Sequence, residues 1–294
     1  MNGFPSLTET EAAIYLRPSF TLEETSLKEF RSLILQFYEH HGRRFAWRQT
    51  SDPYRILLSE VMLQQTQTTR VQPKYELFLS LWPTFADLAG CSLDELLYHW
   101  KGLGYNRRAL NLRKSAKMTE AWGWTIPDDP ALIASLPGVG KATSAALQAF
   151  CYQRKSIYLE TNIRRVLLTC FFPDDEAVKD RRLESLLSLL AEGVTDMKSW
   201  YYALMDYGVL LKQLLPNANV RSAHYAKQSP FENSNRQIRG QLIHLLSDTG
   251  AKEREQIQAV LSSFEEERID NCLEQLQNEG FVQEKDGVYR IAKD

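Results

Sequence analysis

The sequence has few cysteines and no long apolar run. Its 294 residues include four cysteines, at positions 91, 151, 170 and 272, and no two of them form a CxxC pair. This spacing argues against a disulfide framework and indicates buried or free thiols in a reducing compartment, with metal ligation not expected. Apolar runs such as 56–58 and 61–63 are interrupted within a few residues, whereas a membrane span needs about 20 apolar residues. The chain is therefore not expected to cross a membrane.

A secretory signal is also missing from the first residues, because no positively charged segment precedes an apolar core there. The composition, 44% hydrophobic and 24% charged, is ordinary for a globular protein with a sizeable core. We therefore expect a cytoplasmic enzyme or binding protein.

The net charge of −2 conceals an uneven distribution. Residues 30–247 carry a net charge of +7, and residues 248–286 carry −7. Six basic residues fall within positions 101–117. Such a run is most often a solvated face, so the pattern permits nucleic-acid binding without demonstrating it.

Apolar residues recur at spacings of three and four along most of the chain, which predicts an all-α core. The expected helices cover residues 26–41, 54–69, 73–81, 92–99, 105–121, 130–135, 141–152, 160–170, 181–192 and 198–213. Residues 1–25 form an N-terminal extension, residues 26–213 form the helical core, and residues 214–234 form a connector. Within the core, a six-helix part covers about 52–150, and a second helical part combines 26–51 with 151–213.

Residues 235–294 differ in character and predict a small winged-helix-like α+β domain. Helices are expected at 236–247, 253–264 and 266–279, followed by a β-hairpin whose turn is Lys285-Asp286-Gly287. The acidic balance favours a docking or packing role over DNA binding for this domain.

The stretch Leu136-Pro137-Gly138-Val139-Gly140-Lys141 lies between two expected helices. Glycines at a helix N-terminus let backbone N–H groups approach an anion closely, and the helix dipole favours that anion. No strand precedes the stretch, so it is not a nucleotide-binding loop of the usual strand–loop–helix kind. An ordinary helix–helix turn is the alternative.

Glu60 lies in an expected helix that is apolar on most sides. A carboxyl group in apolar surroundings tends to have a raised pKa, which suits a general acid. A paired or partly solvated glutamate is the alternative. The surrounding segment reads Ser59-Glu60-Val61-Met62-Leu63-Gln64-Gln65-Thr66-Gln67.

The chain resembles the helix-hairpin-helix (HhH-GPD) DNA glycosylases in three segments. They are this segment, the Leu136–Lys141 stretch and Trp100-Lys101-Gly102-Leu103-Gly104-Tyr105. The resemblance is closest to the MutY family of adenine DNA glycosylases and runs from about residue 45 to 208. It implies that Glu60 protonates the departing base. Gln65 would wedge into the duplex with the help of Gln64, and Tyr105 would intercalate or stack.

The resemblance also implies a phosphate grip at the hairpin residues Pro137, Gly138, Val139, Gly140 and Lys141, with Arg107 and Arg108 as basic neighbours. A structural K⁺ or Na⁺ would be held there by the backbone carbonyls of Ala134, Leu136 and Val139.

Glu160 occupies the position of the family's essential aspartate, in Tyr158-Leu159-Glu160-Thr161-Asn162. A carboxylate near the sugar would stabilise an oxocarbenium-like transition state. Glu160 is one methylene longer than the family residue, whereas Asn162, a further expected DNA contact, is retained. The alternatives are a changed activity and a helix-capping acid.

Two departures from the family pattern shape the expected chemistry. Ala142 stands where bifunctional members carry a lysine nucleophile, so we expect no lyase activity. The segment 200–208 resembles the helix that precedes four cluster-binding cysteines, but residues 209–231 contain no cysteine. We therefore expect no iron–sulfur cluster, no required cofactor, and a connector held by Arg221, His224, Tyr225 and Phe231.

The sequence thus predicts a monofunctional DNA N-glycosylase of base excision repair that flips and excises a base, adenine in a mispair being the first expectation. One alternative is a mismatch thymine or uracil glycosylase of the same fold, since the family's lesion-reading C-terminal domain is missing. Another is a non-catalytic DNA-structure-binding protein. The expected partner is double-stranded DNA in the cytoplasm, at a bacterial nucleoid, with a repair protein docking on the acidic domain and the chain itself monomeric.

Overall fold

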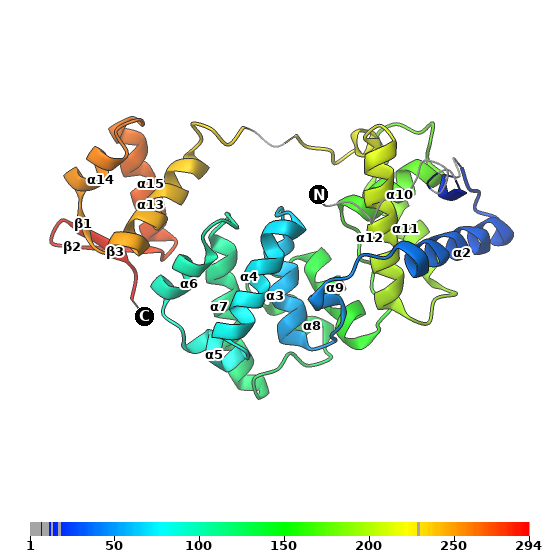
Figure 1. Ribbon diagram of the computed structural model, residues 1–294, viewed down its shortest axis with the longest axis horizontal. Coiled ribbons are helices and arrows are strands. Elements are labelled where there is room, and N and C mark those ends of the chain that lie inside the picture. The colour runs from blue at the N-terminus through cyan, green and yellow to red at the C-terminus, as the bar shows by residue number, and fades with distance from the viewer. Residues whose placement is uncertain (1–6, 8–11, 13, 17–18, 228–229, 294) are drawn as a thin grey trace. The chain divides into compact units, whose positions relative to one another are not determined.

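The computed structural model describes residues 7, 12, 14–16, 19–227 and 230–293, and most of them are helical (Figure 1). Much of the expected N-terminal extension lies outside the described residues. The chain divides into two compact units. Unit 1 comprises Met1–Ile56, Asp128–Ala134 and Val139–Lys227, and unit 2 comprises Leu57–Pro127, Ser135–Gly138 and Gln228–Asp294. The predicted fold class, a helical core with a small C-terminal α+β part, is confirmed.

Unit 1 is built from helices. They are α2 (Glu24–His41), η1 (Ala46–Arg48), α8 (Pro130–Ser135), α9 (Lys141–Tyr152), α10 (Thr161–Phe171), α11 (Asp180–Ala191), α12 (Met197–Leu214) and η3 (Ala218–Arg221). Helix α12 packs against α10 and α2, and Gly208 of α12 allows the backbones of α12 and α10 to approach closely. A Cβ atom on Gly208 would lie 2.4 Å from the carbonyl oxygen of Asn162, so only glycine fits this crossing.

A buried ion cluster ties α12 to the segment that follows α2. The carboxylate of Asp206 is fully buried. The Arg43 backbone N–H and Nε donate to it at 2.7 Å each, and Nη1 and Nη2 of Arg48 donate at 2.8 Å each. The Arg48 guanidinium also lies 4.5 Å from the ring centroid of Tyr202. Each charge is thus desolvated together with its counter-charge, which is the condition for tolerating it in a core.

The helical part of unit 2 contains α3 (Pro53–Leu63, which begins in unit 1), α4 (Thr68–Leu81), α5 (Phe85–Gly90), α6 (Leu93–Trp100), α7 (Arg107–Met118) and η2 (Thr119–Trp122). The predicted helix at 54–69 is wrong at its end, because α3 stops at Leu63 and α4 begins at Thr68. Sequence periodicity missed α5, which begins with a reciprocal capping box between Thr84 and Asp87.

The C-terminal domain of unit 2 has the order expected of a winged helix. It contains α13 (Asn235–Thr249), β1 (Lys252–Glu253), α14 (Arg254–Val260), α15 (Glu266–Asn278), β2 (Val282–Lys285) and β3 (Val288–Ile291). The strands form an antiparallel sheet in the order β1-β3-β2. The predicted hairpin is confirmed, with both Asp286 and Gly287 at positive φ. Strand β1, which pairs with β3, was not predicted.

The connector before this domain is anchored by hydrogen bonds. The Arg221 guanidinium donates to the carbonyl oxygens of Pro173 and Leu168, at 2.7 and 2.8 Å. The expected packing role of Arg221 is therefore confirmed. That of His224, Tyr225 and Phe231 is wrong, because all three side chains are exposed.

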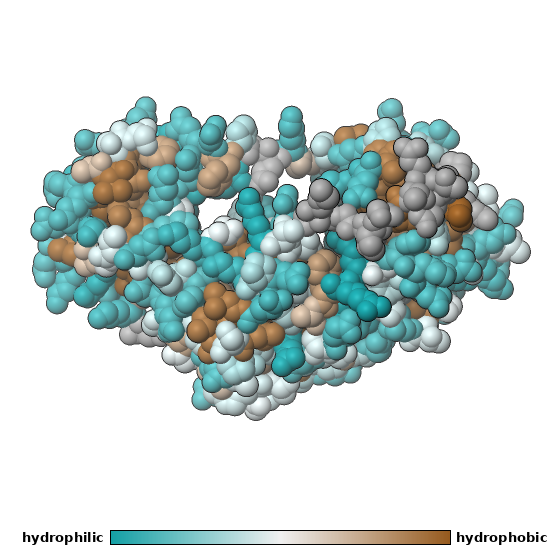
Figure 2. All heavy atoms as spheres, in the orientation of Figure 1, coloured by the Kyte–Doolittle hydropathy of each residue, from teal (hydrophilic) through white to brown (hydrophobic). Residues whose placement is uncertain are grey.

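The surface is ordinary for a globular protein. Hydrophilic side chains cover most of the face in Figure 2, and hydrophobic ones appear in small patches. Among the described residues, no helix combines the length and the apolar character that a bilayer crossing would require.

The buried ion cluster predicts a large stability effect. Asp206→Asn keeps the side-chain volume but leaves Arg43 and Arg48 without a counter-charge, so we expect a loss of about 3–5 kcal/mol in unfolding free energy. The control Asp175→Asn removes the partner of Arg182 in an exposed ion pair, and should cost less than about 1 kcal/mol. Urea unfolding of both variants measures the difference, and equal small losses would contradict the assigned role of Asp206.

Candidate nucleic-acid interface

Helix α3 carries a buried carboxyl group. Glu60 is 8% exposed, and the adjoining residues Leu57, Leu58, Val61 and Met62 of the same helix are buried as well. Burial of a carboxyl group among apolar side chains is costly, so it needs compensation or a function. The burial that the sequence predicts for Glu60 is confirmed, and its role in chemistry stays a prediction.

The turn that follows α3 and the turn that follows α6 each hold one of the expected wedge residues in an unusual backbone conformation. Gln65 has φ = 55° and Tyr105 has φ = 48°, both in the left-handed region that L side chains other than Asn and Asp seldom adopt. Gln65 is exposed, and Tyr105 is 39% exposed. Strained, exposed residues of this kind concentrate at functional sites, where the surrounding structure must hold them in place.

One arginine of α7 holds both turns. Nη1 of Arg108 donates to the carbonyl oxygens of Val61, Met62 and Gln64, at 2.8, 2.9 and 2.7 Å. Its Nη2 donates to the carbonyl oxygens of Leu103 and Gly104 at 2.9 Å each, and to the hydroxyl of Thr66 at 3.0 Å. The carbonyls at the end of α3 lack partners within the helix, so the guanidinium serves as its C-terminal cap.

The prediction that Arg108 contacts phosphate is therefore wrong. Its side chain is 8% exposed, and burial lowers its pKa to about 10, with the nearby Tyr105 acting in the opposite direction. The guanidinium remains charged at neutral pH. The signal for burial was present in the sequence, because Leu112 and Ser115 follow at helical spacing on the same buried face of α7.

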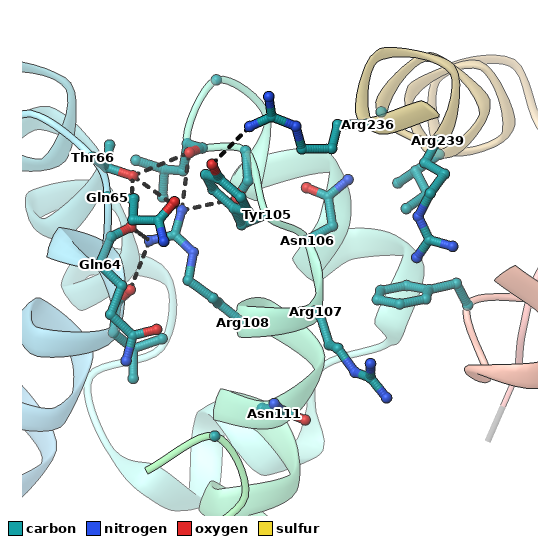
Figure 3. A pocket seen from close by; sticks show the side chains of 18 of the residues that line it. Gln64, Gln65, Thr66, Tyr105, Asn106, Arg107, Arg108, Asn111, Arg236 and Arg239 are labelled. Atoms are coloured by element: carbon teal, nitrogen blue, oxygen red, sulfur yellow. Dashed lines mark hydrogen bonds between the residues drawn. The ribbon is translucent and has the colours of Figure 1, made fainter. Parts of the chain in front are cut away.

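A cavity of about 940 Å³ opens beside these turns in unit 2 (Figure 3). Polar and cationic groups supply much of its lining, including Gln64, Gln65, Thr66, Gln67, Arg70, Tyr105, Asn106, Arg107, Asn111, Arg236 and Arg239. Arg236 reaches from α13 and donates to the Tyr105 hydroxyl at 3.0 Å. The structure thus brings the predicted residues Gln64, Gln65 and Tyr105 to one cavity. The contributions of the C-terminal domain were not predicted.

The glycine hairpin follows α8 and leads into α9. Gly138 has φ = +77°, and a Cβ atom on it would lie 2.8 Å from the side chain of Asn111. Gly140 is the N-cap residue of α9. Pro137 and Gly138 line the cavity, whereas Lys141 forms an ion pair with Glu184. The helix–turn–helix form of the stretch is confirmed, and its phosphate and cation roles remain predictions.

Glu160 is the N-cap residue of α10 in unit 1. Its Oε1 accepts from the backbone N–H groups of Asn162 and Ile163 at 2.8 Å each, and its Oε2 accepts from Asn162 Nδ2 at 3.3 Å. The pKa of the Glu160 carboxyl is raised, because burial outweighs the opposing effect of these two N–H groups and of Arg165 and Arg164. Asn162 is held in turn by Arg165 Nη1, which donates to its Oδ1 at 3.0 Å. The structure thus shows Glu160 as a helix-capping residue, which was the alternative to a catalytic role. Capping is compatible with stabilisation of a sugar cation by the same carboxylate.

In the described part of the chain, no group of three or more His, Cys, Asp or Glu side chains is arranged to hold a metal ion. Among the described cysteines, all four are free thiols.

The comparisons with known proteins agree with this geometry. A family model described as "HhH-GPD superfamily base excision DNA repair protein" matches residues 58–192. An adenine DNA glycosylase of Mycolicibacterium smegmatis is 30% identical over 278 residues, which cover 88% of this chain and 94% of that protein. The chain belongs to the HhH-GPD superfamily.

Other relatives match over a shorter range. An adenine DNA glycosylase of Buchnera aphidicola subsp. Baizongia pistaciae is 35% identical over 62% of this chain, and the chain spans about half (52%) of that protein. Among solved structures, a thermostable thymine-DNA glycosylase has a TM-score of 0.55 and 29% identity, with 62% of this chain and 85% of that chain covered. A non-covalent endonuclease III–DNA complex shares the fold at a TM-score of 0.50 and 18% identity, covering 71% and 91%.

The role of Arg108 in this HhH-GPD chain can be tested without any substrate. Arg108→Met keeps an unbranched side chain but removes every donor, which leaves the carbonyls at the end of α3 and in the 103–104 turn unpaired. Because each orphaned buried acceptor costs about 1–3 kcal/mol, we expect at least about 3 kcal/mol of lost stability. Amide hydrogen exchange at residues 64–66 and 103–105 should accelerate. The control Arg107→Met changes an exposed neighbour, and equal exchange in both variants would contradict the assignment.

Proposed function

We propose that this chain is a monofunctional DNA N-glycosylase that flips adenine from a mispair and excises it in base excision repair. One observation carries the proposal: α3 holds a buried carboxyl group, Glu60, and ends at a strained, exposed glutamine turn. An acid on this helix and a wedge in the turn directly after it suit an enzyme that must open the base stack before it can reach the base. The adenine DNA glycosylases among the relatives support the choice of base.

The proposed reaction uses two carboxyl groups in different protonation states. Glu60 donates a proton to the flipped base, the N-glycosidic bond breaks with its electron pair going to the base, and the sugar becomes an oxocarbenium-like cation. The ionised Glu160 stabilises that cation until water adds and gives up a proton to the Glu60 carboxylate, which restores the acid. Ala142 offers no amine for attack on the sugar, so the product is an abasic site with an intact strand.

We further propose that the hairpin Pro137–Lys141 grips a DNA phosphate through backbone N–H groups, with K⁺ or Na⁺ at the carbonyls of Ala134, Leu136 and Val139. A backbone donor array at the start of α9 suits an anion. An iron–sulfur cluster is not part of the proposal.

A second candidate is a mismatch thymine or uracil glycosylase, which the similarity to the thymine-DNA glycosylase structure favours. The two candidates differ in the released base. Single-turnover excision from duplexes that contain adenine opposite 8-oxoguanine or guanine, and thymine or uracil opposite guanine, separates them, with alkali revealing the abasic sites.

The acid role predicts a specific loss. Glu60→Gln removes the proton donor with little change of shape, so we expect excision to fall about 10²–10⁴-fold, as for the loss of a general acid. The control Glu76→Gln removes the same charge from an exposed position on α4 and should excise like the wild type. Wild-type rates in Glu60→Gln, on the duplex that the wild type cuts, would exclude the acid role.

The two roles of Glu160 can be separated by a pair of variants. In Glu160→Gln the amide oxygen can still accept the N–H bonds of α10, so stability should change little while excision falls at least about 10²-fold from lost charge stabilisation. Glu160→Ala loses the cap as well and should unfold about 1 kcal/mol more easily. Thermal unfolding and single-turnover excision measure both effects. If Glu160→Gln excises normally, the carboxyl group is a cap alone.

A further inference from the structure

We propose that the face of α13 carrying Arg236 and Arg239 binds the sugar–phosphate backbone of DNA, which makes the C-terminal domain a second DNA contact beside the Gln65 and Tyr105 turns. The inference rests on the proposed function, since it assumes that these turns meet DNA. It assigns to the domain a partner that its acidic composition argued against.

The first step is the shared cavity. Arg236, Arg239, Gly240 and His244 of α13 line the same cavity as the turns that carry Gln65 and Tyr105. The Arg236–Tyr105 hydrogen bond fixes the start of α13 beside the predicted stacking residue (Figure 3). A second contact, the ion pair between Lys101 and Asp248, joins the far end of α13 to the end of α6. A ligand of the turns would therefore also meet α13.

The second step is the chemistry of the walls. Besides the buried Arg108, four arginines from three helices line the cavity: Arg70 on α4, Arg107 on α7, and Arg236 and Arg239 on α13. Six side-chain amides of glutamine and asparagine join them, at positions 64, 65, 67, 106, 111 and 275. Arginine and amide donors are the groups that contact phosphate and sugar oxygens. The cavity therefore suits a nucleic-acid backbone.

The third step is the distribution of charge within the domain. In a helix-turn-helix fold the second helix of the motif enters the major groove, which here is α15. That helix begins Glu266-Glu267-Arg268 and continues with Asp270 and Glu274, so its charge opposes entry into DNA. Residues 235–247 of α13, by contrast, carry two arginines and no acid. Insertion of α15 into the major groove is therefore disfavoured. Contact of α13 with the sugar–phosphate backbone of DNA remains as the binding mode.

One acidic residue reduces the positive charge of the α13 face. Glu279 lines the cavity and pairs with Arg239 at 2.7 Å. The charge of Arg239 is thus neutralised within the domain. Loss of Glu279 should therefore strengthen DNA binding, which gives a prediction of opposite sign to the loss of an arginine.

The test measures binding of the full chain to a duplex of about 25 base pairs that contains adenine opposite 8-oxoguanine. Fluorescence anisotropy at several salt concentrations is recorded in the Glu60→Gln background, which prevents turnover. Arg236→Gln should weaken binding several-fold and reduce the slope of log Kd against log salt by about 1, as for one lost phosphate contact. Glu279→Gln should tighten binding. The control Arg254→Gln removes the same charge from α14, away from the cavity, and should change Kd less than about two-fold.

The outcomes separate the two proposals. Unchanged affinity in Arg236→Gln would overturn the inference, and tighter binding would overturn it by showing that α13 covers the turns instead of assisting them. In either case normal wild-type excision would leave the proposed function standing. A wild-type chain that neither binds nor excises any duplex of the panel would remove the proposed function and the inference together. Thermal unfolding of each variant confirms that the domain remains folded.

Discussion

The interface depends on one buried guanidinium. Arg108 supplies the donors that α3 lacks at its C-terminal end, and it also holds the carbonyls of the turn before Tyr105. Without these bonds, left-handed conformations at Gln65 and Tyr105 would relax, because such conformations persist only where neighbouring groups enforce them. An arginine whose guanidinium is exposed for phosphate contact could not also donate to these buried carbonyl oxygens. The desolvation of Arg108 is therefore compensated by six acceptors, and the predicted wedge residues gain fixed positions.

Local sequence patterns predicted most helices but not where α3 ends. The spans at 130–135 and 141–152 and the Asp286-Gly287 hairpin were predicted correctly because their signals, apolar spacing and glycine turns, lie within the elements themselves. The break at Leu63 depends on Arg108, 45 positions later, and no local periodicity contains that contact. The family resemblance led to Gln65 and Tyr105 as predicted wedge residues, which line the cavity. Arg236 and Arg239, which line the same cavity, were missed because composition described only the average charge of their domain.

Average charge is a poor guide to this domain because its acids are placed unevenly. Several acids already serve the domain: Glu253 caps α14, Asp270 pairs with Arg254, and Asp248 pairs with Lys101. Others are concentrated on α15. Within a Debye length of about 10 Å at moderate salt, a ligand senses the charges of the face that it meets and little of the rest. The relevant quantity is therefore the sign of the α13 face, and that face is basic.

The role proposed for Glu160 requires that one carboxyl group both cap a helix and stabilise a developing cation. The two carboxylate oxygens of Glu160 have different hydrogen-bond partners. Oε1 accepts both backbone N–H groups of α10, whereas Oε2 accepts one longer bond from Asn162, which Arg165 in turn orients. The cap fixes the group, and the helix N-terminus favours its ionised form against the burial that opposes it. The additional methylene relative to aspartate changes the reach of the side chain, but the capping bonds restrict where that reach can lead. A positioned anion with one lightly used oxygen is what stabilisation of a developing cation requires.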